Sequence, residues 1–150
     1  MVNWQSLLDG SVAASGIAVK GVCLGDGLNT LPLKEITEVT PRLAQDSEPR
    51  GMVTRESPLE EVRKHGGDIH AGPVTYEVSQ GRVRRILVRG NLLSPLPFKT
   101  EGDIERLLGP PSGVERKPDS VVYHYPERGF SVGWHPKEGR LEHFAIGVTA

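Results

Sequence analysis

From residue 73 onward, apolar and polar residues alternate with a period of two over short segments, a pattern typical of half-buried β-strands. The alternation predicts five strands, at residues 73–79, 82–89, 120–126, 129–135 and 140–148. Turn residues separate most of them, so neighbouring strands are expected to pair as antiparallel hairpins. The resulting sheet should have one apolar face under helices and one face toward water.

Two segments, 58–65 and 101–108, have the apolar spacing of helices instead. Ser57 and Thr100 stand where helix N-caps are expected, and a glycine follows each segment. Together with the strands, they predict an α+β fold in which short helices pack on one face of an antiparallel sheet. The expected core consists of Phe130, Val132, Trp134, Phe144, Ile146, Ile104 and Leu107.

The N-terminal part of the chain has weaker patterns. Residues 3–9 predict one short helix, because Trp4, Leu7 and Leu8 share a helical face. Residues 16–25 alternate and then change phase at Gly21, which favours a kinked strand.

Two strand sequences match each other. Residues 81–88 (GRVRRILV) and 139–146 (GRLEHFAI) share the pattern Gly-Arg-apolar-x-x-apolar-x-apolar. We expect a single domain, residues 1–150. The match indicates two possible repeat units within it, 57–90 and 100–148, and the second unit has an extra hairpin. Alternation fails at the two x positions of both copies, and this failure predicts a β-bulge there.

Composition excludes several classes of function. The chain has 150 residues and a formal net charge of −1, so no overall field attracts nucleic acid or an anionic membrane. A single cysteine excludes an internal disulfide and a multi-cysteine zinc site. No apolar run is long enough to span a membrane, and the N-terminus lacks the basic start of a signal peptide. We therefore expect a cytoplasmic protein without a membrane partner.

Three histidines, His124, His135 and His143, fall close together near the C-terminus, but no Asp, Glu or Cys stands at a ligand-like spacing from them. The glycine-rich residues 24–30 lack the spacing of a phosphate-binding loop. Arginines crowd residues 82–89, where they fit either a charged edge strand or contacts to a phosphate backbone. We expect no catalytic residue, metal or cofactor.

The second half of the chain resembles a known unit. Residues 100–113 (TEGDIERLLGPPSG) and 123–146 (YHYPERGFSVGWHPKEGRLEHFAI) are similar to the helix-plus-sheet unit of outer-membrane assembly lipoproteins. In duplicate, the unit also resembles the β-lactamase inhibitory protein family. The resemblance covers residues 100–146 well and 57–88 loosely, and it implies a sheet that binds a protein.

The leading hypothesis is therefore a stoichiometric protein-binding module, most concretely a bacterial immunity protein that blocks a cognate toxin. Aromatic and arginine side chains dominate interface energetics, so exposed residues of these types are the expected contacts. The predicted partner-binding residues are Tyr123, His124, Tyr125, Arg128, His135, Arg82 and Arg84. Replacing Tyr125 or Arg128 with Ala is expected to leave folding nearly intact. The alternatives are a small enzyme using histidines on the open sheet face and a nucleic-acid-binding module.

Overall fold

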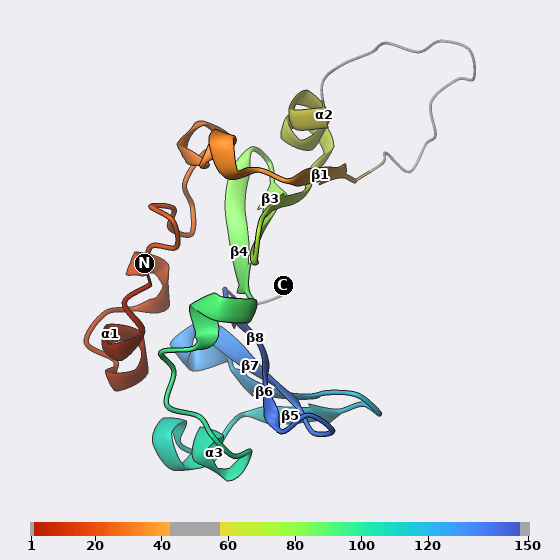
Figure 1. Ribbon diagram of the computed structural model, residues 1–150. Helices are drawn as coiled ribbons and strands as arrows, with labels where there is room; N and C mark the ends of the chain where they lie inside the picture. Colours follow the sequence, from red (N-terminus) through yellow and green to blue (C-terminus); the bar gives the residue numbers. More distant parts are fainter. Residues whose placement is uncertain (1, 43–57, 148–150) are drawn as a thin grey trace.

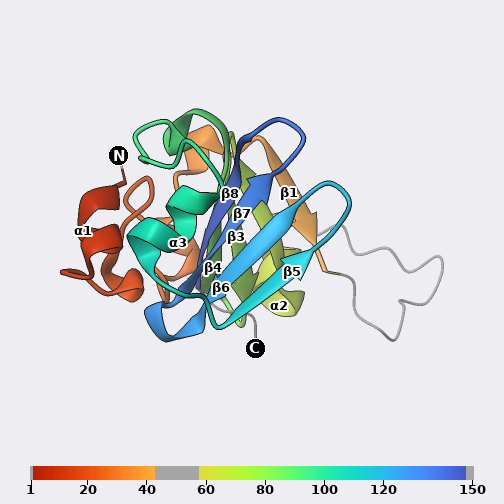
Figure 2. The same cartoon turned by 90° about the horizontal axis from the view of Figure 1, so that it is seen from below.

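The computed structural model describes residues 2–42 and 58–147. An eight-stranded antiparallel sheet with the order β1-β2-β3-β4-β8-β7-β6-β5 forms its centre (Figures 1 and 2). The strands are β1 (Glu38–Pro41), β2 (Gly67–Ala71), β3 (Val74–Ser79), β4 (Arg82–Val88), β5 (Gly113–Arg116), β6 (Val121–Tyr125), β7 (Phe130–His135) and β8 (Arg140–Ile146). The α-helices are α1 (Trp4–Asp9), α2 (Pro58–His65) and α3 (Gly102–Leu108). Short 3-10 helices are η1 (Ala14–Gly16), η2 (Leu28–Thr30), η3 (Leu33–Glu35), η4 (Gly90–Leu93) and η5 (Pro126–Arg128).

The α+β class, the three helices and the five strands predicted from the sequence are confirmed, with ends that differ by one or two residues. The expected cap Ser57 and the last residue of the strand expected at 140–148 lie outside the described residues. The strand predicted at residues 16–25 is wrong. Lys20 and Gly21 both have positive φ, of 53° and 81°, and they form a tight turn between the bridged residues Val19 and Val22.

Three strands were not predicted, and each is short. β1 and β5 have four residues each and lie at the two edges of the sheet. β2 begins at Gly67, within the glycine pair expected only to end a helix. A Cβ on Gly67 would overlap the backbone of Thr40, so glycine permits β1 to approach β2 this closely. These strands form because they pair with neighbouring strands, and the alternation of apolar and polar residues within a short segment does not predict such pairing.

The helix ends follow the physical chemistry of capping. The side chain of Asn3 accepts a hydrogen bond from the Ser6 backbone N–H at the start of α1. At α3 the expected cap Thr100 is wrong: Glu101 stands at the N-cap position, and it makes no side-chain capping bond. Asp103 Oδ2 instead accepts from the backbone N–H groups of Lys99 and Thr100, at 2.8 Å and 3.0 Å. An ion pair with Arg106 and these N–H donors hold the pKa of Asp103 well below its usual range. Asp103 therefore stays ionised and fixes the entry to α3.

One hydrophobic core fills the space between the sheet and the elements on its covered face. Irregular N-terminal chain supplies much of the cover, through Ile17, Val19 and Val22. The hydroxyl of Tyr76, on β3, donates to the backbone carbonyl of Val19 at 2.9 Å and ties this segment to the sheet. Six of the seven expected core residues are buried, whereas Leu107 is 40% exposed. On a helix as short as α3, Leu108 and Ile104 reach the core instead.

The sheet has an approximate two-fold symmetry centred between β4 and β8. Ile86 pairs with Ile146, Leu87 with Ala145, and Val88 with Phe144. Residues 81–88 align with 139–146, so Leu87 and Ala145 are equivalent positions of the two repeats and pair with each other. Ile86 pairs with the equivalent of Val88, and Val88 pairs with the equivalent of Ile86. The two halves each contain four strands, but the first half includes β1, which lies before the unit expected at 57–90.

Both predicted bulges are present. The register between β3 and β4 shifts between Glu77 and Val78, which leaves Arg84 without an opposite residue. The register between β7 and β8 shifts between Gly133 and Trp134, which leaves Glu142 without one. Each bulge falls at the x-x pair of its repeat.

Trp134→Ala should lower the free energy of unfolding by about 3–5 kcal/mol, because it truncates a buried aromatic side chain in the centre of the core. Chemical denaturation measures the loss. Leu33→Ala is the control: Leu33 is 58% exposed, so the change should stay within about 0.5 kcal/mol of the unaltered protein. Equal losses for both variants would contradict the assignment of the core.

Candidate functional site

The helices α1 and α3 and the N-terminal segment lie together on one side of the sheet (Figure 2), and α2 contributes Val62 and Leu59 to the same core. Within the described residues, no helix covers the opposite side, which we call the open face. Residues directly opposite each other in antiparallel strands point to the same face, so strand register identifies its members. The open face is therefore mapped from the pairings.

One line of paired residues crosses all eight strands on the open face. We call it the cross-sheet row, and it consists of Glu38, His70, Thr75, Leu87, Ala145, Ser131, His124 and Gly113. Its inner six members are symmetric about the Leu87–Ala145 pair, reading histidine, hydroxyl, apolar, apolar, hydroxyl, histidine. The two halves of the sheet thus place similar chemistry at equivalent positions, where core packing does not require it.

The hydroxyl residues of the row are Thr75 and Ser131, which are 7% and 6% exposed. Among the described residues they are the buried polar ones. His70 Nδ1 lies 3.0 Å from Thr75 Oγ1, within hydrogen-bonding distance. On the other half, His124 Nε2 lies 2.6 Å from Glu115 Oε1. Polar neighbours therefore hold both histidines in place.

A second layer of side chains flanks the row. Arg85 forms an ion pair with Glu77 across β3 and β4, with Nη1 and Oε2 3.0 Å apart. The imidazole of His143 lies against Gly133, where any Cβ would overlap the ring. His143 Nδ1 also lies 3.1 Å from Glu142 Oε1. Gly133 thus makes room for a flat ring on the open face.

Burial lowers the pKa of His143 below its ordinary value, because the charged imidazolium loses water. The carboxylate of Glu142 acts in the opposite direction, and the positive charges of Arg89 and Arg85 add to the lowering. The net direction favours neutral imidazole at the centre of the open face.

Two of the expected contact residues are not on the surface. Tyr123 and Tyr125 are 2% and 4% exposed, and they belong to the core with Val121. Their expected exposure is wrong, because alternation on β6 sends His124 and Val122 to the open face and both tyrosines to the core. The Tyr123 hydroxyl donates to a Glu101 carboxylate oxygen. Tyr125 donates to the Gly109 carbonyl at 2.9 Å. Burial raises the pKa of each tyrosine to about 12.

Arg128 has a structural role. Its Nη2 group donates to the carbonyls of Leu7 and Leu8, at 2.7 Å and 2.8 Å, and so holds the end of α1. Its guanidinium also lies 5.2 Å from the ring centroid of Phe130. The expectation that Arg128→Ala leaves folding nearly intact conflicts with these contacts.

The remaining predicted contacts are dispersed. His135 stands near one end of β7 on the open face, and its Nδ1 accepts a hydrogen bond from the Glu138 backbone N–H. Arg82 donates to the Gly25 carbonyl at 3.0 Å. Arg84 donates to Gln80 and shares a hollow of about 350 Å³ with Arg128. The seven residues therefore do not form one patch, and only His124 lies in the cross-sheet row.

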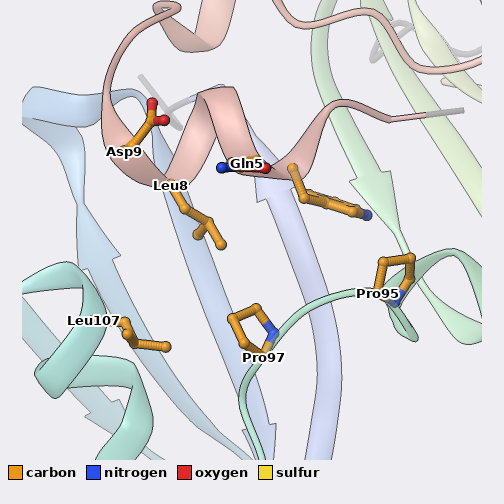
Figure 3. A pocket seen from close by; sticks show the side chains of 7 residues that line it. Gln5, Leu8, Asp9, Pro95, Pro97 and Leu107 are labelled. Atoms are coloured by element: carbon orange, nitrogen blue, oxygen red, sulfur yellow. The ribbon is translucent and has the colours of Figure 1, made fainter.

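A separate apolar hollow of about 420 Å³ lies between α1 and α3. Figure 3 shows Leu8 from α1, Leu107 from α3 and Pro97 from the preceding loop around it. The indole N–H of Trp4 donates to the Leu92 carbonyl at 2.8 Å, which fixes one wall. The exposure of Leu107 follows from its position at this hollow.

Comparison of the chain with protein-family models, curated proteins and solved structures gives no match. Within the described residues, no group of His, Cys, Asp and Glu side chains could hold a metal ion. No helix in this part of the chain is long and apolar enough to cross a membrane.

Arg128→Ala should lower the free energy of unfolding by about 2 kcal/mol, since hydrogen bonds to charged groups are stronger than neutral ones. Thermal or chemical denaturation measures the effect. Arg106→Ala is the matched control, because that side chain is 66% exposed in a helical surface ion pair. If the two variants are equally stable, Arg128 does not anchor α1.

The lowered pKa of His143 makes stability depend on pH. Above its ordinary value of 6.5, the imidazole is neutral in both folded and unfolded chains. As the pH falls below that value, the unfolded chain takes up the proton first, so folding stability decreases. His143→Gln should therefore lose less stability than the unaltered protein between about pH 7.5 and about pH 5. Parallel losses in urea denaturation at the two pH values would contradict this prediction.

Proposed function

We propose that this protein is a stoichiometric binding module that docks the open face of its sheet onto a protein partner. The most concrete form of the proposal is an immunity protein that inhibits a bacterial toxin. The observation that carries it is the cross-sheet row, a symmetric line of polar and apolar residues on a face that no described helix covers. The resemblance of residues 100–146 to inhibitory and assembly proteins is the reason for naming a toxin as the partner.

The open face is large enough for a specific interface. Eight strands spaced about 4.8 Å apart span roughly 33 Å, and five residues along each strand add about 17 Å. These dimensions give a projected area of roughly 560 Å², of the same order as the about 800 Å² that a stable complex buries on each partner. A small ligand would use only a fraction of it.

The side chains on the open face are already held in place before any partner arrives. The Glu77–Arg85 ion pair and the contacts of His70 and His124 restrict their rotamers. Binding then costs less side-chain entropy than on a surface of free lysines or arginines. Acidic and basic groups lie side by side, so a complementary partner would present mixed polar groups rather than one sign of charge.

The enzyme alternative has one observation in its favour. Glu115, His124 and Ser131 lie on three adjacent strands, and a carboxylate, an imidazole and a hydroxyl form the usual set for nucleophilic catalysis. However, neither the hollow between α1 and α3 nor the hollow that Arg84 shares with Arg128 includes these side chains, so neither of them would enclose a substrate against this group. Hydrolysis of an activated ester that is lost in Ser131→Ala would favour the enzyme.

The nucleic-acid alternative depends on the arginines of β4. They turn to separate neighbours: Arg82 to a backbone carbonyl, Arg84 to Gln80 and Arg85 to Glu77. A continuous basic track along a phosphate backbone is therefore less favoured. Binding to duplex DNA or RNA that weakens steeply with salt would support this alternative instead.

A matched pair of substitutions tests the docking face. Leu87→Arg places a charge at the centre of the cross-sheet row, and Leu33→Arg makes the same change at an exposed site on η3. We expect a partner captured from native cell extract at 1:1 stoichiometry to bind Leu33→Arg normally. Its affinity for Leu87→Arg should fall at least about thirtyfold, the loss typical of an interface hot spot.

Circular dichroism and thermal melting first establish that both variants are folded. If the partner releases from Leu33→Arg but not from Leu87→Arg, the interface lies elsewhere on the molecule. If no protein binds stoichiometrically at all, the binding-module proposal is rejected. Toxicity of the captured protein, relieved by co-expression with this chain, tests the immunity form separately.

A further inference from the structure

A polar hollow lies at the end of the β3–β4 hairpin, away from the centre of the cross-sheet row. Three segments distant in the sequence form it: η2, α2 and the hairpin turn, which meet at one end of the sheet (Figure 1). The hollow has a volume of about 480 Å³ and is lined by Gly27, Leu28, Asn29, Arg63, Gln80, Gly81 and Arg82. This volume is within the usual range of small-molecule sites, roughly 300–1,000 Å³.

The charged residues that line this hollow are all basic. Arg63 and Arg82 contribute two guanidinium groups, Asn29 and Gln80 contribute two carboxamides, and no lining residue is acidic. Each guanidinium carries five N–H donors in a planar fork that matches an oxyanion. Arg82 uses Nη1 for the Gly25 carbonyl, and Arg63 forms a 3.4 Å ion pair with Glu60. Within the described part of the chain these contacts engage one terminal nitrogen of each guanidinium, so other donors of both forks can face a ligand.

The backbone around the hollow is fixed independently of any ligand. Leu28 N–H donates to the Gly81 carbonyl at 3.2 Å, and Val83 N–H donates to the Asp26 carbonyl at 2.8 Å. Gln80 has a positive φ of 56°, a conformation that side-chain-bearing residues adopt at a cost. The hairpin therefore presents Gln80 and Arg82 from a defined turn rather than from a mobile loop.

We propose that this hollow is a binding site for a small organic molecule that carries a phosphate or carboxylate group. The two guanidinium groups would hold the oxyanion with charge-assisted hydrogen bonds. The two carboxamides and the side chain of Leu28 would contact the rest of the molecule. A bare inorganic ion would leave most of the volume unfilled. The site lies at the end of the β3–β4 hairpin, outside the cross-sheet row, and the proposal does not depend on the docking proposal.

Calorimetric titration with ribose 5-phosphate as the probe, at constant ionic strength, tests the site. Arg82→Ala or Arg63→Ala should weaken binding at least about tenfold, since each loses charge-assisted hydrogen bonds. Arg89→Ala is the matched control: it removes an exposed arginine from just beyond the end of the same strand, outside the hollow, and should change affinity less than about twofold. Glu60→Gln should strengthen binding, because it releases Arg63 from its ion pair.

Two further titrations compare other sources of the anionic group with the sugar phosphate. Inorganic phosphate should bind more weakly than ribose 5-phosphate, because it lacks the organic body. A glutamate-rich peptide that binds more tightly than the sugar phosphate would overturn the small-molecule assignment in favour of a partner's acidic side chain. Equal weakening by Arg89→Ala and Arg82→Ala, or no binding of any probe, would overturn the site itself.

Discussion

Three residue pairs between β4 and β8 hold the two halves of this sheet together, and the remaining architecture depends on that short contact. Beyond it, the N-terminal half of β4 pairs with residues 25–27 instead, through hydrogen bonds between Val83 and both Gly25 and Asp26. Gly147 makes the change of partner possible. Its φ of +105° turns the chain away, and a Cβ there would lie 2.7 Å from the Arg84 carbonyl oxygen.

The two faces of the sheet are covered unequally. One face receives three short helices and a long irregular N-terminal segment, anchored by Arg128 at α1 and by Tyr76 at Val19. Arg128 satisfies carbonyls in the last turn of α1, and Tyr76 satisfies one in the irregular segment that follows. The other face receives no described helix, and it keeps the polar residues of eight strands together. The open face is thus a consequence of how the N-terminal segment is tied down.

Much of this fold was predictable from the sequence, because β3, β4, β6, β7 and β8 alternate and α2 and α3 carry helical patterns of their own. The bulges were predictable because alternation fails at the same place in both repeats. The edge strands were not, since four residues paired on one side give too little pattern. For the site, the parity of β6 already separated His124 from Tyr123 and Tyr125. Aromatic character alone wrongly placed these tyrosines on the surface.

The bulges connect the repeat to the open face. Val83 points to the core, and strict alternation would send Arg85 there as well. The extra residue at Arg84 shifts the phase, so Ile86 and Val88 return to the core while Arg85 and Leu87 reach the open face. The same shift at Glu142 brings His143 and Ala145 to equivalent places. A single inserted residue in each half therefore determines which side chains a partner would meet at the centre of the sheet.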